Sequence, residues 1–153
     1  MIHRLQFEKF PRWNDEGSGL AELALVLPVF LLMFAAAVDF GRAYCLAVDL
    51  SGAAEAGALY GVQNPTDVAG MVTASQNDAP DLSGLSATAS YGCECPDGSS
   101  AVASCSAPPT CTGSYVNYVQ VTTTAAYTPI ITFTGMPAAG SFQSMARMRV
   151  SSE

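Results

Sequence analysis

The sequence has few of the residues on which enzymes and nucleic-acid-binding proteins rely. Its one histidine is His3 and its one lysine is Lys9, both close to the N-terminus. A catalytic Ser-His-acid or Cys-His group, or a phosphate-binding loop with its lysine, therefore cannot be built farther along the chain. Only 12% of the residues are charged, the formal net charge is −7, and Lys and Arg form no cluster beyond the N-terminus. We expect neither an enzyme nor a protein that binds nucleic acid.

Acidic residues in the second half of the chain are scattered rather than gathered in one motif. Asp78 with Asp81, or Glu94 with Asp97, could bind calcium weakly. We interpret all four as solvated loop acids, and we expect no cofactor and no metal.

The most prominent feature that the sequence does have is an uncharged, mostly apolar run from Leu23 to Val38, which follows Glu22. Together with residues 18–22 it forms a stretch of 21 residues, which is long enough to enter a bilayer, since a membrane-spanning helix takes roughly 20 residues. His3, Arg4, Lys9 and Arg12 precede the run, whereas three arginines follow it among nine acids. Because basic residues flank the cytoplasmic end of a span, we expect a cytoplasmic N-terminus and a translocated C-terminal part.

The apolar run is compatible with three fates during export. It can remain uncut as a plain signal anchor, or signal peptidase can cut in the A-x-A sequence at residues 35–37, so that the mature chain starts at Val38. Alternatively, cleavage after Gly17 makes Ser18 the first residue of the mature chain and Glu22 its fifth.

A Gly, four residues and a Glu at the start of an apolar helix is the spacing found in type IV pilins. Residues 17–28, 38–44 and 53–60 together resemble the TadE-like minor pseudopilins of tight-adherence (Flp-type, type IVb-like) pili. Residues 144–150 resemble that family's closing strand. Two features depart from the family pattern: Asp39 stands where Glu is more usual, and a Cys-rich insert is present.

The resemblance implies a minor pilin, pseudopilin or assembly factor that supports pilus biogenesis, adhesion and secretion. A prepilin peptidase would remove residues 1–17, a cytoplasmic leader, by cutting between Gly17 and Ser18. The partners would be other pilin and pseudopilin subunits and the pilus assembly platform. The location would be the bacterial inner membrane, crossed once with the C-terminal domain periplasmic or extracellular, or the pilus filament.

Glu22 needs a physical reason, because a lone ionised carboxylate in a membrane helix is costly and by default functional. In a pilin-type assembly the mature N-terminus is an amine, and a carboxylate four residues on can neutralise the amine of a neighbouring subunit. We therefore predict that Glu22 is an assembly residue. In a plain anchor it would instead lie at the membrane interface, where the dipole of the helix start favours a negative charge.

The helical pattern continues beyond the apolar run. Residues that are nearly all small recur at spacings of three and four: Ala43, Ala47, Leu50, Ala54, Gly57 and Gly61. This face permits close approach of the chain's own domain or of another helix. Because Asn64-Pro65 ends the pattern, we predict one helix from Gly19 to Gln63, with residues 18–38 in the membrane and residues 39–63 as an exterior stalk.

Residues 64–153 have the pattern of a small exterior domain. Thr66 can cap a short helix, and alternation predicts strands at residues 85–91, 115–126 and 144–150. Residues 130–133 fit either a short edge strand or an exposed apolar loop. We predict an α+β fold that is pilin-like, with the long N-terminal transmembrane and stalk helix packed on a small sheet, and the short links favour antiparallel pairing.

Four of the five cysteines lie in the loop predicted for residues 92–113: Cys93, Cys95, Cys105 and Cys111. In a translocated segment they indicate two disulfides rather than a zinc site. Because Cys93 and Cys95 are too close to bond each other, Cys93 pairs with Cys105 or with Cys111, and both pairings remain open. Cys45 should be a free thiol. The stapled loop also supports an alternative function, a stand-alone membrane-anchored domain that binds an exterior ligand.

Overall fold

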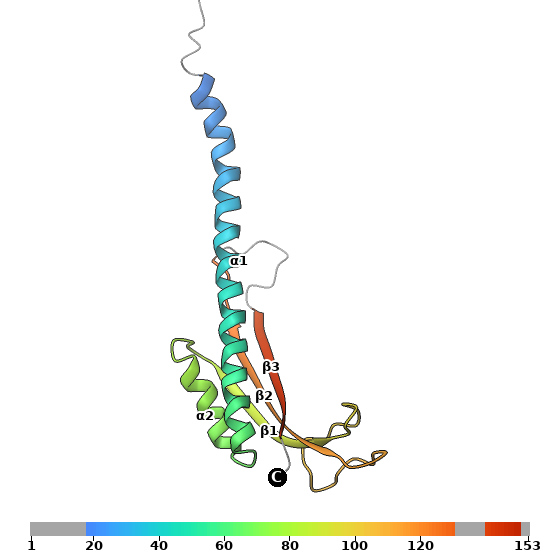
Figure 1. Cartoon of the computed structure of the whole chain (residues 1–153). Coiled ribbons are helices and arrows are strands. Elements are labelled where there is room, and N and C mark those ends of the chain that lie inside the picture. Colours follow the sequence, from blue (N-terminus) through green and yellow to red (C-terminus); the bar gives the residue numbers. More distant parts are fainter. Residues whose placement is uncertain (1–17, 131–139, 151–153) are drawn as a thin grey trace, which may run out of the picture. The chain divides into compact units, whose positions relative to one another are not determined.

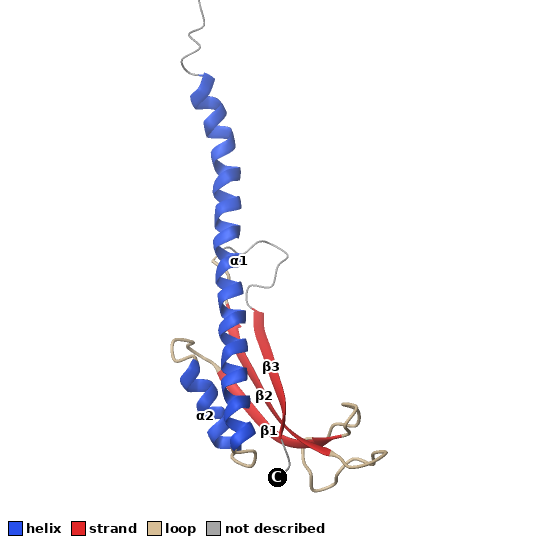
Figure 2. Cartoon of the chain, viewed as in Figure 1, coloured by secondary structure: helices blue, strands red, loops and turns tan. Residues whose placement is uncertain are grey.

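The computed structural model describes residues 18–130 and 140–150 (Figure 1). Its elements are α1 (Ser18–Gln63), α2 (Val68–Asp78), β1 (Ser86–Glu94), β2 (Val116–Tyr127) and β3 (Gly140–Val150), shown by type in Figure 2. The predicted leader and most of the apolar segment predicted at residues 130–133 lie outside the described residues. Contacts within the chain divide it into two units, residues 1–37 and residues 38–153.

All described residues of the first unit belong to α1. The side chains of residues 20–34 are exposed within the chain. By length and composition, α1 contains a stretch near its N-terminus that is long and apolar enough to cross a membrane. Pro28 lies inside α1, where it removes one backbone N–H donor. The helix nevertheless continues to Gln63, which confirms the predicted continuous helix.

The second unit contains a three-stranded antiparallel sheet in the order β1-β2-β3. Val121 on the central strand lies opposite Ala89 of β1 and Ala146 of β3. Because side chains alternate across a strand, Val119, Val121 and Thr123 are buried together on one face. The predicted antiparallel pairing and the α+β fold class are confirmed.

Helices α1 and α2 pack on this buried face of the sheet. The core cluster joins Ala58 of α1, Met71 of α2, and Val119 and Val121 of β2. The buried residues of α1 are mostly small: Leu50, Ala53, Ala54, Gly57, Ala58 and Gly61. The packing of the predicted small-residue face against the chain's own domain is therefore confirmed.

Buried polar side chains in this core have hydrogen-bond partners, as buried polar groups generally must. The Thr123 hydroxyl of β2 donates to the Leu50 carbonyl oxygen of α1 over 2.8 Å. The Ser75 hydroxyl donates to the Met71 carbonyl oxygen of its own helix over 3.1 Å. The first bond ties the helix to the sheet independently of apolar packing.

The short helix α2 is capped by Asp67. The prediction that Thr66 caps this helix was wrong. The Oδ1 atom of Asp67 accepts a 2.9 Å hydrogen bond from the backbone N–H of Gly70, and its Oδ2 accepts one of 2.7 Å from the Tyr60 hydroxyl. Because α2 starts at Val68, Asp67 is the residue whose side chain can reach the free N–H groups of the first turn.

Strand β1 continues past the predicted strand and ends at Glu94. Glu94 is only 4% exposed and lies 3.2 Å from Arg147 Nη1 and 2.8 Å from Arg149 Nε, both on β3. The Arg147 guanidinium also lies 4.3 Å from the Tyr118 ring centroid on the intervening strand. The interpretation of Glu94 as a solvated loop acid was wrong. The sheet extends through Glu94, and its buried carboxylate forms ion pairs with two arginines instead of being solvated.

Two disulfides join the end of β1 to the loop that follows, Cys93–Cys105 and Cys95–Cys111. They select one of the two pairings that the sequence had left open. Cys45 is free and exposed, as predicted.

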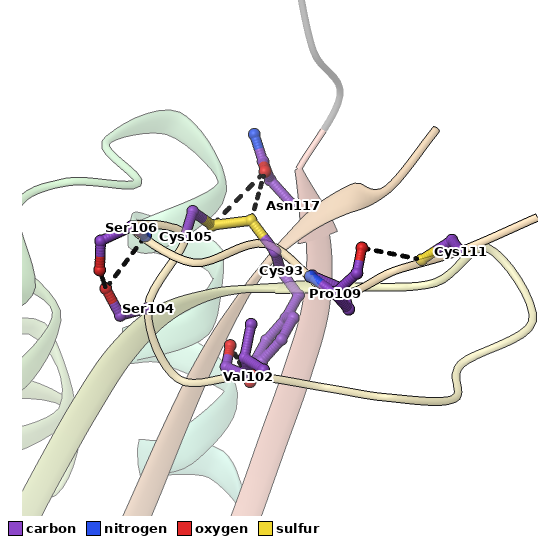
Figure 3. The surroundings of a disulfide bond; sticks show 9 residues. Cys93, Val102, Ser104, Cys105, Ser106, Pro109, Cys111 and Asn117 are labelled. Carbon is purple, nitrogen blue, oxygen red and sulfur yellow. Dashed lines mark hydrogen bonds between the residues drawn. A yellow bond between two sulfur atoms is a disulfide. The ribbon is translucent and has the colours of Figure 1, made fainter. Parts of the chain in front are cut away.

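The loop returns to the edge of β1 through Val102. Cys93 and Val102 exchange backbone hydrogen bonds of 3.0 and 2.8 Å. In Figure 3 the oxygen of Asn117 points at the Cys93–Cys105 bridge, 3.2 Å from the sulfur of Cys93 and 3.7 Å from that of Cys105. Since disulfide sulfurs carry no proton, these are polar contacts that orient the Asn117 side chain.

Candidate functional site

The candidate assembly site is the exposed N-terminal part of α1. The helix begins at Ser18, so Glu22 lies in its second turn, among the exposed apolar side chains of Leu20, Leu23 and Leu25. Within residues 18–130 and 140–150, Glu22 makes no ion pair. Gly17 lies outside the described residues, so cleavage between Gly17 and Ser18 stays a prediction. This part of α1 thus presents a single carboxylate on an otherwise apolar surface.

A second group of polar contacts surrounds Asp39, which directly follows the apolar run. The backbone N–H of Ile130 donates to both carboxylate oxygens of Asp39, at 2.9 and 3.1 Å. The Tyr127 hydroxyl donates to the Asp39 carbonyl oxygen at 2.8 Å. We call Asp39, Tyr127 and Ile130 the Asp39 clamp, because these contacts join α1 to the end of β2.

The electrostatics of the Asp39 clamp suit fixation rather than catalysis. Arg42 Nη1 lies 3.4 Å from Asp39, whose side chain is only 15% exposed. Loss of solvent contact and the nearby Asp39 carboxylate raise the pKa of Tyr127 above its ordinary value of 10.0. The Tyr127 hydroxyl therefore stays protonated at neutral pH and remains a donor to α1.

Sequence reasoning did not find the Asp39 clamp. The available signal was a carboxylate immediately after an apolar run, where an acid without partners is costly. Its partners lie 88 and 91 positions farther along the chain, and no spacing rule connects residues at that separation.

The disulfide-joined loop offers the other candidate surface, a shallow cavity of about 280 Å³. The cavity is lined by Cys95, Pro96, Asp97, Ser99, Ser100, Thr110, Cys111 and Thr112. The Asp97 carboxylate accepts hydrogen bonds from the Ser99 backbone N–H and hydroxyl, at 3.0 and 2.7 Å, which lower its pKa below 3.8. Ligand sites are lined mostly by apolar side chains with a few convergent polar groups. The side chains that line this cavity are instead mostly short and polar. In the described part of the chain, no group of three or more His, Cys, Asp and Glu side chains could hold a metal ion.

Both the candidate assembly site and the similarity to known proteins lie on α1. Residues 17–59 match the family model of TadE-like protein. The TadE-like segment contains Glu22, the whole apolar run, Asp39 and the sheet-facing part of α1 as far as Leu59. It suggests involvement in a tight-adherence pilus. No curated protein and no solved structure matches the chain.

Proposed function

We propose that the chain is a minor pilin or pseudopilin of a tight-adherence pilus, incorporated through helix packing of residues 18–38. The observation that carries this proposal is Glu22, an acid in an exposed apolar helix within the TadE-like segment that forms no ion pair with the described residues. An apolar helix alone would serve as an anchor, whereas a carboxylate inside it requires a cationic partner.

The cationic partner in this proposal is the N-terminal amine of a neighbouring subunit. Prepilin peptidase removes residues 1–17 in the inner membrane, which leaves the amine on Ser18. The amine of one subunit and Glu22 of the next then neutralise each other in a low dielectric, where losing either partner strands a charge. The pair would set the axial register between subunits and orient the C-terminal domain outward.

The first test is the N-terminal residue of the protein recovered from membranes, read from an intact mass. We expect a chain that starts at Ser18. A start at Met1 would indicate a stand-alone anchored domain, with the disulfide-joined loop as its binding surface. A start at Val38 would indicate cleavage by signal peptidase, and either result contradicts prepilin processing.

The second test is Glu22→Ala in cells that make the other pilus components. Membrane insertion should persist, while co-purification with pilin subunits should fall by more than about tenfold, because a stranded charge costs several kcal/mol and each 1.4 kcal/mol is a factor of ten. Glu55→Ala is the matched control, since Glu55 is also an exposed glutamate of α1. Unchanged assembly of the Glu22 variant would remove the role of this residue in the register.

A further inference from the structure

Two exposed aromatic residues immediately follow the apolar run. Phe40 is 74% exposed and Tyr44 is 64% exposed, and they lie one helical turn apart on α1. At 1.5 Å per residue, Tyr44 is only about 9 Å beyond Val38 along the helix. The headgroup layer adds roughly 5–8 Å to each side of a 30 Å hydrocarbon core. Phe40, about 3 Å beyond Val38, falls within this layer, and the backbone of Tyr44 lies at its outer limit. Aromatic side chains are enriched in this layer because their rings are amphipathic.

The end of β2 is held at the same level of α1. The Ile130 N–H bonds to the carboxylate of Asp39 fix the Ile130 backbone beside the residue that directly follows Val38. The bond from the Tyr127 hydroxyl to the Asp39 carbonyl oxygen supports the same placement. The Ile130 side chain nevertheless remains 64% exposed. An apolar side chain is thus kept uncovered within one helical turn of the end of the apolar run.

The exposed aromatic pair, Phe40 and Tyr44, and the exposed Ile130 side chain lie on different sides of α1. Successive helix residues are about 100° apart around the axis, so Phe40 lies about 100° and Tyr44 about 140° around α1 from Asp39, which meets the end of β2. A bilayer surrounds a single spanning helix on every side. A segment that is held beside such a helix at the end of its apolar run must therefore contact the lipid headgroups.

We propose that Phe40, Tyr44 and Ile130 form an interfacial collar that lies in the headgroup region, so that the tip of β2 is a second membrane contact. Arg42, half exposed at the same level, supplies a cation for lipid phosphate. The occupant of this surface is the lipid interface, because the collar is continuous along α1 with the apolar run. The inference rests on membrane insertion of that run, which is one part of the proposed function, and is independent of assembly through Glu22.

The test uses the full chain in nanodiscs of phosphatidylcholine and phosphatidylglycerol, with and without brominated acyl chains. Trp13 is the only tryptophan, so a Trp13→Phe background allows single reporters at Ile130→Trp, Phe34→Trp and Met145→Trp. Phe34 lies within the apolar run. Met145 is 59% exposed but pairs with Thr122, about 17 Å along β2 from Tyr127 at 3.4 Å per residue.

Brominated lipid should quench the reporter at position 34 most strongly, should quench the one at position 130 less strongly but clearly because the headgroup region borders the acyl chains, and should leave the one at position 145 bright. If only the reporter at position 34 is quenched, the apolar run is inserted but the collar is wrong. If the reporter at position 130 is shielded from aqueous acrylamide without being quenched by bromine, a second copy of the protein covers it, which also overturns the proposal. An unquenched reporter at position 34 removes the premise of insertion.

Discussion

Replacement of Gly57 by alanine tests the close packing of α1 on α2 and the sheet. A Cβ at this position would overlap the Ser75 hydroxyl and lie 2.8 Å from the Met71 carbonyl oxygen and 3.2 Å from Val121 Cγ1. The Ser75 side chain can rotate, but the Met71 carbonyl is backbone and can move only if α2 moves. Overpacking of a core of this kind costs about 1–3 kcal/mol.

The packing cost must be separated from helix propensity, because alanine gains up to about 1 kcal/mol over glycine inside a helix. Gly41 is the matched control: it lies in the same helix, and a Cβ there meets nothing within 4 Å. Gly41→Ala should therefore stabilise the protein by about 0.5–1 kcal/mol. The difference in unfolding free energy between the two variants isolates the packing cost, which we expect to be about 1–3 kcal/mol.

The assay is urea unfolding of the full chain in detergent micelles with its disulfides intact, followed by the near-ultraviolet circular dichroism of the tyrosines. The Gly57→Ala midpoint should fall below that of Gly41→Ala, with little change in the slope of the transition. If both variants are stabilised equally, α2 does not approach α1 as closely as the geometry requires, and the explanation of the small-residue face fails.

Two further predictions concern the loop and the cap of α2. Without reductant, a thiol-alkylating reagent should label Cys45 alone, and replacing the Cys95–Cys111 pair by serines should cost about 2–4 kcal/mol of stability; five labelled thiols would contradict both bridges. Hydrogen bonds from Tyr60 and Gly70 lower the pKa of Asp67 below 3.8, so its contribution to stability is present above that pH and lost as the pH falls through the folded-state pKa. Asp67→Asn keeps the cap acceptor and should reduce the drop in urea midpoint between about pH 5 and about pH 2.5, whereas an unchanged drop would show that other groups cause it.

The elements with a clear period could be predicted from the sequence. Alternation at Val119, Val121 and Thr123 indicated the central strand and its buried face, because one side of the sheet packs on the helices. The small residues of α1 likewise indicated the face that packs. Both patterns are local, and local periodicity records which side of an element is buried.

The features that could not be predicted depend on which distant segments meet. The sequence limited Cys93 to two partners, and only the return of the loop to β1 decided between them. Glu94 looked like a loop acid because nothing near it in the chain shows that Arg147 and Arg149 approach across β2. The role of Asp39 was missed for the same reason. Each contact joins segments that are distant in the sequence, and the flanking residues do not encode which distant segment they meet.

The small residues that allow α1 to pack closely also affect how readily the chain aggregates during synthesis. The helix is made first, whereas the hydroxyl that bonds the Leu50 carbonyl arrives 73 positions later. Contacts between such distant residues form slowly, and apolar surface left uncovered in the meantime promotes aggregation. The small-residue face of α1, which stays uncovered until the sheet is made, consists largely of residues such as Ala53, Ala54 and Gly57, and each of these has little apolar area. The face of α1 that packs most closely in the folded protein therefore also exposes little apolar surface before the sheet is synthesised, which limits aggregation.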